Sequence, residues 1–447
     1  MTEGRFGRLT DAPASFVLVG GRVIDPEAGR DEVRDLAVVD GVMVDSVPDG
    51  AERIDARGLI VAPGLCDLHT HLREPGTEGE TMTTGTRAAA RGGFTTVCAM
   101  PNTDPPCDTA ERVQTAQGRA TDAACRVRVI AAATRGRVGA DPTDVEELAA
   151  AGVVGFSDDG AGVASEPVAE ELLRRLVAVG MPLVEHPEDA GLAGGGVMRA
   201  GATAVRLGLP GWVPAAETSM VERDLRLAEA IGAWIHLTHL SSTASIEAVR
   251  RAKARGVRVT CDVTPHHLAL TDTWVAGSRR FAWDDADDTR PGEAAYEGST
   301  RVNPPLSTAE EALTLLAAVE DGTVDAIATD HAPHPPERKA VPFAEAAPGL
   351  IGLETARSIG LAAVGSGRIG LHRLMAALST RPAALIGESR SLATGSAADL
   401  VVFDPAARWR VAAESLASAS SNTPLLGMEL PGAVLMTVAE GRITYRA

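Results

Sequence analysis

Aromatic side chains are scarce in this sequence of 447 residues: Phe, Trp and Tyr together make up only 3%. Hydrophobic residues nevertheless reach 45%, which is enough for a large core. That core must consist mainly of Ala, Val, Leu and Ile, as expected of a parallel sheet wrapped by helices. The scarcity of aromatics therefore favours an α/β architecture.

Basic residues and cysteines are also few. The formal net charge of -18 disfavours nucleic acid and anionic membranes as partners, because both bind basic surfaces. A local arginine could still bind a small anionic substrate. The five cysteines are odd in number and form no Cys-x-x-Cys pair, which fits a reduced cytoplasm better than a disulfide framework.

Long apolar runs are absent as well. No segment is long and apolar enough to span a bilayer, and residues 1–15 lack the apolar stretch of a signal peptide. We therefore expect a cytoplasmic protein without membrane contacts.

The sequence does contain a regular alternation of short β-rich runs and helical patterns. The eight β-rich runs are Leu65–His71, Thr95–Pro101, Val127–Thr134, Val153–Asp159, Pro182–His186, Trp234–His239, Arg258–His266 and Asp325–His331. The helical patterns between them include Thr81–Ala90, Asp144–Ala150, Val168–Val179, Glu217–Ile231, Ala244–Arg255 and Glu310–Val319. Eight β/α units predict a TIM-type (β/α)8 barrel over residues 65–390, with its active site at the carboxyl ends of the strands.

The two ends of the chain follow a different pattern. Phe16–Asp25 and Leu36–Val47 are predicted as strands, as are Leu400–Asp404 and Val434–Tyr445. We expect residues 1–64 and 391–447 to form one small β domain, with the barrel inserted between its two parts. The alternative is a pair of separate extensions.

One stretch of the predicted barrel is unusual. Val275–Thr300 is rich in Asp, Arg, Gly and Ser and joins the seventh strand to the segment that contains Asn303. It is interpreted either as a surface insertion, which is slightly favoured, or as a lid over the active site.

The first β-rich run carries the most informative motif, a pair of histidines two residues apart. On a strand, His69 and His71 point to the same face and can share one metal ion. Arg73 follows at the strand end, where its planar guanidinium suits a substrate carboxylate. An isolated His-x-His is more often structural, so the motif needs support from the rest of the chain.

That support comes from the ends of the other strands, which also carry metal-ligating residue types. The candidate ligands are His69, His71, Asp159, His186, His239 and Asp330. Four histidines and two aspartates suffice for two adjacent divalent ions, a kind of centre that activates water and polarises a carbonyl group. Each residue alone is weak evidence, because Asp158-Asp159-Gly160, for example, could simply form a turn.

The motifs together resemble those of dihydroorotases, members of the amidohydrolase superfamily, over essentially the whole chain. They are His69–Gly76, Ala99–Thr103, Phe156–Gly160, Val263–His267, Arg301–Pro305, Ala328–His334 and Pro348-Gly349 ahead of Gly352–Thr355. The resemblance is to the class whose metals are bridged by an aspartate instead of a carbamylated lysine.

This resemblance implies a set of roles. It implies two divalent ions, usually zinc, held by the six candidate ligands, with Asp159 and not Asp158 as the bridge. It also implies substrate contacts from His71, Arg73, Asn102, Asn303, His334 and the backbone of Pro348 and Gly349. Asp330 is expected to be the catalytic base, taking a proton from the attacking water and returning it to the leaving nitrogen.

The implied reaction is the reversible hydrolysis of (S)-dihydroorotate to N-carbamoyl-L-aspartate, a step of de novo pyrimidine (UMP) biosynthesis. Two alternatives remain open: another cyclic amidohydrolase, such as an allantoinase or hydantoinase, and a non-catalytic partner of aspartate transcarbamoylase. Many hydantoinase-like relatives carry a carbamylated lysine on strand four, whereas this chain has no lysine before Lys253. Non-catalytic relatives typically lose metal ligands, and this chain has all six.

Further partners are expected from the same resemblance. The substrate is a small molecule, and the chain is expected to form a homo-oligomer, with aspartate transcarbamoylase as a candidate partner. Nothing in the sequence decides whether the two enzymes associate.

Several residues near the motifs have simpler interpretations. Arg73 could pair with Glu74, and Asn102 could be a turn former. His236 and the pair His266–His267 are expected to be structural. Cys66 is expected to be a small buried hydrophobic residue despite its place beside the first ligand.

Overall fold

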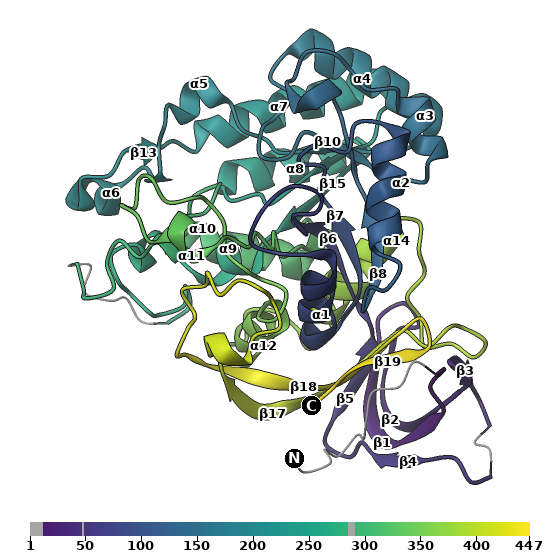
Figure 1. Ribbon diagram of the computed structural model, residues 1–447. Helices are drawn as coiled ribbons and strands as arrows, with labels where there is room; N and C mark the ends of the chain where they lie inside the picture. Colours follow the sequence, from purple (N-terminus) through teal and green to yellow (C-terminus); the bar gives the residue numbers. More distant parts are fainter. Residues whose placement is uncertain (1–11, 47–48, 285–290) are drawn as a thin grey trace.

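Figure 1 shows the computed structural model, which describes residues 12–46, 49–284 and 291–447. Parallel strands surrounded by helices form most of the molecule, and a sheet built from both ends of the chain lies below them in this view. The predicted TIM-type barrel with a terminal β domain is confirmed.

Short parallel strands follow one another around the barrel. They are β6 (Leu65–Thr70), β7 (Phe94–Ala99), β8 (Arg126–Val129) continued by β9 (Ala131–Ala132), β10 (Phe156–Ser157), β11 (Leu183–Glu185), β14 (Ile235–Leu237), β15 (Val259–Val263) and β16 (Ala326–Ile327). A parallel bridge between Thr70 and His331 joins the last run to the first. Each of the eight predicted β-rich runs therefore contains a barrel strand.

Helices cover the outside of the barrel. The longer ones are α1 (Met82–Gly92), α2 (Ala110–Arg119), α3 (Val145–Ala150), α4 (Glu166–Val179), α7 (Ala215–Ile231), α8 (Thr243–Ala254), α10 (Ala309–Asp321) and α12 (Ala356–Gly365). Shorter elements are α5 (Ala190–Ala193), β12 (Met198–Arg199), α6 (Ala202–Leu207), β13 (Gly211–Trp212), α9 (Pro265–Ala269), α11 (Pro336–Lys339), α13 (Leu371–Met375) and α14 (Arg381–Leu385). Thr81 and Thr308 form capping boxes at the starts of α1 and α10, which satisfy backbone N–H groups that a helix leaves free. Among the described residues, no helix combines the length and apolarity needed to cross a membrane.

The terminal sheet combines strands from both ends of the chain. Its strands are β1 (Phe16–Asp25), β2 (Arg30–Val39), β3 (Val42–Val44), β4 (Arg53–Asp55), β5 (Ile60–Pro63), β17 (Leu400–Arg410), β18 (Glu429–Ala439) and β19 (Arg442–Arg446). The order is β19-β18-β17-β5-β1-β2-β3, with β4 beside β1, and the antiparallel pair β5–β17 joins the two ends. The sheet shows that the two ends form one structure and not separate extensions.

Strand β5 and the first four residues of β17 are buried on both faces and contribute to two cores. Val401 and Phe403 pack into the barrel core, whereas Leu400 and Val402 pack into the core of the terminal sheet. Successive side chains of a strand point to opposite faces, which explains the unbroken apolar sequence of this run. The terminal sheet is therefore packed directly against the barrel.

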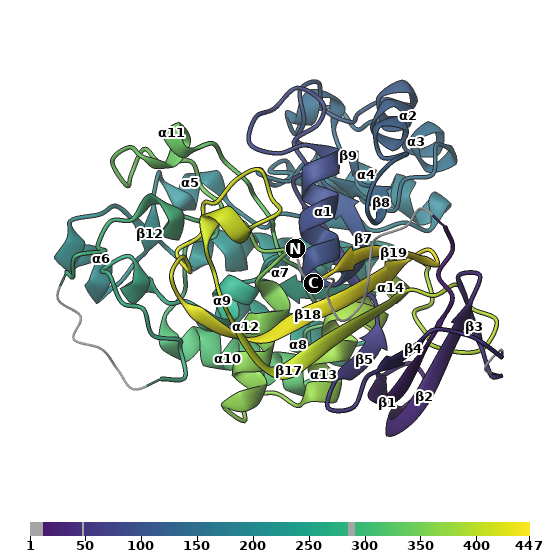
Figure 2. The ribbon, with the colours of Figure 1, turned by 60° about the horizontal axis from the view of Figure 1, so that its bottom comes forward.

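Residues 411–428, between β17 and β18, leave the sheet and reach the barrel (Figure 2). The backbone N–H of Ala419 donates to Glu80 at 3.0 Å. The Asn422 Nδ2 donates to the backbone oxygens of Ala332 and Gly349 at 3.0 and 3.2 Å. The C-terminal part of the chain thus supports loops that follow the last barrel strand.

The unusual stretch Val275–Thr300 is only partly described, since residues 285–290 lie outside the described residues. Its described parts pair with each other: the N–H of Gly292 donates to the oxygen of Ala276 at 2.8 Å, and that of Tyr296 to the oxygen of Val275 at 2.9 Å. None of the described residues of Val275–Thr300 lines the cavity at the carboxyl ends of the barrel strands.

Candidate metal centre and substrate pocket

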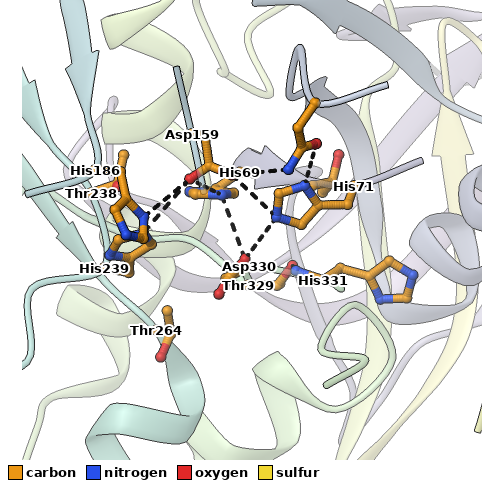
Figure 3. A network of polar contacts seen from close by, with 12 residues as sticks. His69, His71, Asp159, His186, Thr238, His239, Thr264, Thr329, Asp330 and His331 are labelled. Atoms are coloured by element: carbon orange, nitrogen blue, oxygen red, sulfur yellow. Dashed lines mark hydrogen bonds and ion pairs between the residues drawn. The ribbon is translucent and has the colours of Figure 1, made fainter. Parts of the chain in front are cut away.

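The six candidate ligands converge at the carboxyl ends of the barrel strands, although they come from five different strand ends. Figure 3 shows the four histidines surrounding Asp159 and Asp330. All six side chains are buried. They are His69, His71, Asp159, His186, His239 and Asp330.

Asp159 occupies the centre of this group. Its Oδ1 lies 3.2 Å from His69 Nε2, 3.6 Å from His186 Nδ1 and 3.7 Å from His239 Nε2. Its Oδ2 lies 3.6 Å from His71 Nε2. Asp159 therefore lies within 3.7 Å of one nitrogen of each of the four imidazoles.

Asp330 faces the same centre from the opposite side. Its Oδ1 lies 3.0 Å from His71 Nε2 and 3.5 Å from His69 Nε2. Two groups of three could each hold a metal ion, one made of His69, His71 and Asp330 and the other of His69, Asp159 and His239. The two groups share His69, so the potential ion sites are adjacent.

The donor atoms themselves fit a divalent metal. Both ring nitrogens of His69 and the Nδ1 of His239 are buried without a hydrogen-bond partner among the described residues. Buried polar atoms without partners are costly, and a metal ion on His69 Nε2, which faces Asp159, would satisfy one of them. Imidazole and carboxylate are also the donor types that zinc prefers.

Charge interactions keep both carboxylates ionised. Burial opposes ionisation, but His69, His186 and His239 hold the pKa of Asp159 well below its ordinary value. Burial is likewise outweighed at Asp330, whose pKa is lowered by His69 and His71. The reverse effect acts on His69: against the effect of burial, Asp159 and Asp330 raise its pKa to about 10. Protons therefore compete with metal ions for this imidazole.

Three of the candidate site residues have an uncommon backbone conformation. The φ angles of Arg73, His239 and Asp330 are 62°, 38° and 48°, in the left-handed region that residues other than glycine rarely adopt. Such strained residues persist only where the surroundings hold them, and they concentrate at functional sites. The strand ends are thus turned so that these side chains face the centre.

Buried carboxylates that the sequence analysis missed hold two of the strand ends. Asp67 accepts hydrogen bonds from the backbone N–H of His69 at 3.2 Å and of Thr329 at 2.9 Å, which links the first strand to the last. Asp262 accepts from the N–H of His239 at 2.7 Å and bonds His236 Nε2 at 2.9 Å. The sequence offered one signal for Asp67 and Asp262: each is a charged residue inside an otherwise mainly apolar strand.

The two neighbouring aspartates of strand four have different surroundings. Asp158 accepts from the backbone N–H of Thr134 at 2.9 Å and does not line the cavity, whereas Asp159 does. Arg137, which the sequence analysis also missed, donates to the backbone oxygens of both aspartates. Only Asp159 is therefore placed among the histidines.

A cavity of about 220 Å³ opens above the centre. All candidate site residues except the deeper His69 line it. Its lining consists of His71, Arg73, Asn102, Asp159, Gly160, His186, His239, Asn303, Asp330, Ala332, His334, Arg338, Ala347, Pro348 and Gly349.

Arg73 lies on one side of this cavity together with His334. Its Nε donates to the oxygen of Pro333 at 3.1 Å, and its Nη2 lies 3.5 Å from His334 Nε2. Glu74 does not pair with it, because that carboxylate bonds Met82 N at 2.7 Å and Arg119 Nη1 at 3.3 Å. Burial and the charge of Arg73 lower the pKa of His334 to about 3, so this imidazole is neutral.

The two asparagines connect the cavity wall to the histidines. Asn102 Oδ1 lies 2.9 Å from His71 Nδ1, and its Nδ2 donates to Asp159 Oδ2 at 3.3 Å. Asn303 Nδ2 lies 3.4 Å from His186 Nε2. Asn102 is thus more than a turn former, because its side chain orients a candidate ligand.

The residues expected to be structural lie outside the cavity lining. His236 bonds Asp262, and His267 Nε2 lies 2.9 Å from the oxygen of Pro304. His266 is buried, and burial lowers its pKa to about 4. Burial likewise raises the pKa of the Cys66 thiol to about 12, which leaves it inert at neutral pH.

Solved structures with the same fold include hydantoinases. The L-hydantoinase (dihydropyrimidinase) from Arthrobacter aurescens superposes with a TM-score of 0.82 at 24% identity, covering 96% of each chain. The D-hydantoinase (dihydropyrimidinase) from Thermus sp. gives 0.77 at 25% identity over 96% of this chain and 95% of the other. Fold, histidine–aspartate centre and relatives together define a metal-dependent cyclic amidohydrolase.

Sequence comparison narrows the class. The family model described as "Dihydro-orotase-like" matches residues 58–245. A dihydroorotase from Citrifermentans bemidjiense is 40% identical over 97% of this chain and 100% of its own length. One from Anaeromyxobacter dehalogenans is 44% identical over 95% and 96%. The chain belongs to the dihydroorotase family, whose members use divalent metal ions.

Proposed function

We propose that this protein catalyses the reversible hydrolysis of (S)-dihydroorotate to N-carbamoyl-L-aspartate in pyrimidine (UMP) biosynthesis. One observation carries the proposal most directly: a single cavity joins the histidine–aspartate centre to Arg73 and His334. A ring amide can reach the centre while a carboxylate on the same small molecule reaches the guanidinium. The family relationship supports the same reaction.

The proposed metal ligands are the six buried residues of the centre. These side chains would hold two divalent ions, most readily zinc, with Asp159 as a ligand common to both. When bound, such ions acidify a water molecule and polarise the carbonyl that it attacks. Asn102 holds His71 and Asp159 in place through the contacts at 2.9 and 3.3 Å.

Asp330 is the proposed catalytic base. It lines the cavity, and its low pKa keeps it ionised and able to accept a proton from the attacking water. After the ring C–N bond breaks, the same carboxyl group returns that proton to the leaving nitrogen. In ring closure the two transfers run in reverse.

The cavity wall is proposed to bind the substrate. Arg73 supplies charged N–H donors to the carboxylate, and His334 and Asn102 are placed to add further hydrogen bonds. Asn303, His71 and the backbone of Pro348 and Gly349 complete the cavity lining, and the Pro348 oxygen lies 2.8 Å from His334 Nε2. Holding the ring in one orientation accounts for a large part of the rate enhancement expected of such a site.

The two alternatives are less well supported. The described part of strand four carries Asp159 and no lysine, unlike the carbamylated-lysine hydantoinases, and Arg73 suits a substrate with a free carboxylate. A non-catalytic role does not explain why all six candidate ligands are brought together. A comparison of dihydroorotate, allantoin and hydantoin as substrates distinguishes a dihydroorotase from another cyclic amidohydrolase.

We also propose a cytoplasmic location, a homo-oligomeric state, and a β domain formed by residues 1–64 and 391–447 around a barrel of residues 65–390. Light scattering of the purified protein tests the oligomer. Co-purification with aspartate transcarbamoylase tests the candidate partnership.

The central experiment measures ring opening of (S)-dihydroorotate by the purified protein before chelation, after chelation and after zinc is restored. We expect turnover that disappears with the metal and returns with it. A folded, zinc-loaded protein without turnover would contradict the proposal.

A further inference from the structure

Lys339, at the end of α11, is an unusual buried lysine. The residue is only 8% exposed to solvent. The ammonium group donates to three backbone oxygens, those of Ala347 at 2.6 Å, Gly349 at 2.8 Å and Arg301 at 3.3 Å. An ammonium has three N–H donors, so these contacts use its full capacity.

The three acceptors belong to two segments of the substrate pocket. Ala347 and Gly349 flank Pro348, and all three line the cavity. Arg301 lies two residues before Asn303, which lines the cavity as well. The N–H of Gly349 also donates to the oxygen of Arg301 at 2.9 Å, so the segments are in direct contact and Lys339 binds both of them.

The wall at Gly349 leaves little room for adjustment. The residue has a φ of 124°, and a Cβ atom there would lie 2.5 Å from the Ala332 Cβ and 3.2 Å from His334 Nε2. The backbone at this point therefore approaches closely the imidazole proposed to contact the substrate. A small displacement of Gly349 would therefore move the backbone that contacts His334.

We propose that Lys339 is a positioning residue for substrate binding, which fixes the Ala347–Gly349 wall against the Arg301–Asn303 segment through its three carbonyl contacts. The inference rests on the proposed function, because it assigns a role in that reaction. Lys339 does not line the cavity, so it acts through the backbone that does.

The electrostatic surroundings support this role. Burial and, to a lesser extent, the charge of Arg301 lower the pKa of Lys339 to about 7, against the opposing effect of Glu297. A buried cation without a hydrogen-bonded carboxylate is unfavourable for stability. Three backbone oxygens converge on this ammonium group, and within the described part of the chain it is the one donor that joins Ala347, Gly349 and Arg301.

Lys339→Met tests the proposal, because it removes the donors and keeps much of the apolar stem. The loss of an interaction that acts on binding raises KM and leaves kcat nearly unchanged. We expect KM for dihydroorotate to rise about tenfold or more, with kcat within about twofold of the parent. Lys339→Arg, which keeps charge and donors, should recover part of the loss.

The only other lysine provides a matched control. Lys253 Nζ also donates to a backbone oxygen, that of Thr323 at 2.8 Å, and pairs with Asp325 at 2.6 Å, outside the cavity lining. Lys253→Met should leave KM unchanged. An unchanged KM in Lys339→Met, an equal rise in both variants, or a fall in kcat alone would overturn the proposal.

A second measurement uses the unsubstituted protein, so it can be made even if Lys339→Met fails to fold. Because the sequence has only two lysines, ¹⁵N-lysine labelling gives two side-chain signals in an NMR spectrum. Saturation with N-carbamoyl-aspartate should shift the Lys339 signal and not that of Lys253. Shifts of both or of neither would contradict the inference. If the unsubstituted protein binds and turns over no dihydroorotate, it is the proposed function that fails.

Discussion

The floor and the wall of the pocket are built in different ways. The floor consists of the six candidate ligands at the strand ends, all of them buried and held by neighbours such as Asp67 and Asp262. The wall consists of Arg73 and of the loops and short helix α11 from Ala332 to Gly349, which Lys339 and Asn422 hold largely through backbone atoms. Chemistry that needs fixed geometry is thus assigned to strands, and substrate selection to loops.

The largest expected effect concerns the floor. Asp330→Asn removes the proposed base but keeps an oxygen in place, so we expect turnover to fall about 10²- to 10⁴-fold while part of the metal remains bound. Steady-state kinetics and metal analysis of the same preparation measure both quantities.

Asp325→Asn is the matched control, since this residue precedes strand β16 and pairs with Lys253 away from the cavity. It should retain turnover. Unchanged activity in Asp330→Asn would exclude Asp330 as the base.

The next effect concerns the wall. Arg73→Met removes a charged hydrogen-bond donor, an interaction typically worth about 1.5–3 kcal/mol. We therefore expect kcat/KM for dihydroorotate to fall about tenfold to a hundredfold, with metal content unchanged. Arg119→Met, which removes an exposed partner of Glu74, serves as the control. A loss of metal in Arg73→Met would show that floor and wall are not independent.

A smaller effect is expected from the support beneath the floor. Asp67→Asn weakens the link between the first and last strands, and residues that orient metal ligands typically contribute about tenfold or more to metal affinity. We expect zinc to bind about tenfold more weakly, measured by competition with a chelator. Equal affinity would mean that the strand ends are positioned without this carboxylate.

The last effect concerns stability and not activity: a pH dependence of the free energy of unfolding that comes from the wall. The pKa of Lys339 is lowered to about 7 by burial and by Arg301, against the effect of Glu297, whereas the unfolded chain has an ordinary value of about 10.4. Between these values the unfolded state binds more protons, so the free energy of unfolding should rise with pH. Compared with Lys339→Met, the gain should be about 2 kcal/mol between about pH 7 and about pH 9.

Urea denaturation of both proteins at the two pH values measures this difference. His334 faces the same wall, but its pKa of about 3 keeps it neutral throughout the range. An identical pH dependence in the two proteins would mean that Lys339 titrates normally.

The same contrast explains how much the sequence could predict. Apolar runs ending in His or Asp are local patterns, so the barrel strands and the six floor residues were found from spacing, although their role as ligands stays a prediction. The wall residues His334, Pro348 and Gly349 were implied by resemblance to a family and not by periodicity. Lys339 and Asn422 were missed, because their significance comes from backbone contacts made only in the folded chain.

The ends of the strands in the terminal sheet were predicted less well than their centres. Strand β2 begins at Arg30, before the predicted Leu36, and β17 continues to Arg410 beyond the predicted Asp404. None of these additional residues is buried: those of β2 are mostly charged, and those of β17 include both apolar residues and arginines. Hydrophobic alternation indicates a strand only where one face is buried, so such extensions are invisible to it.

The alternating side chains of β5 and β17 have a consequence for engineering the molecule. Deleting a single residue among Leu400–Phe403 would exchange the side chains offered to the two cores, since neighbouring positions point in opposite directions. The barrel should therefore not fold as an isolated fragment, because removing the terminal sheet would expose apolar surface of the barrel core. Deletions that shorten this enzyme are therefore better placed in its loops than in β5 or β17, between the barrel and the terminal sheet.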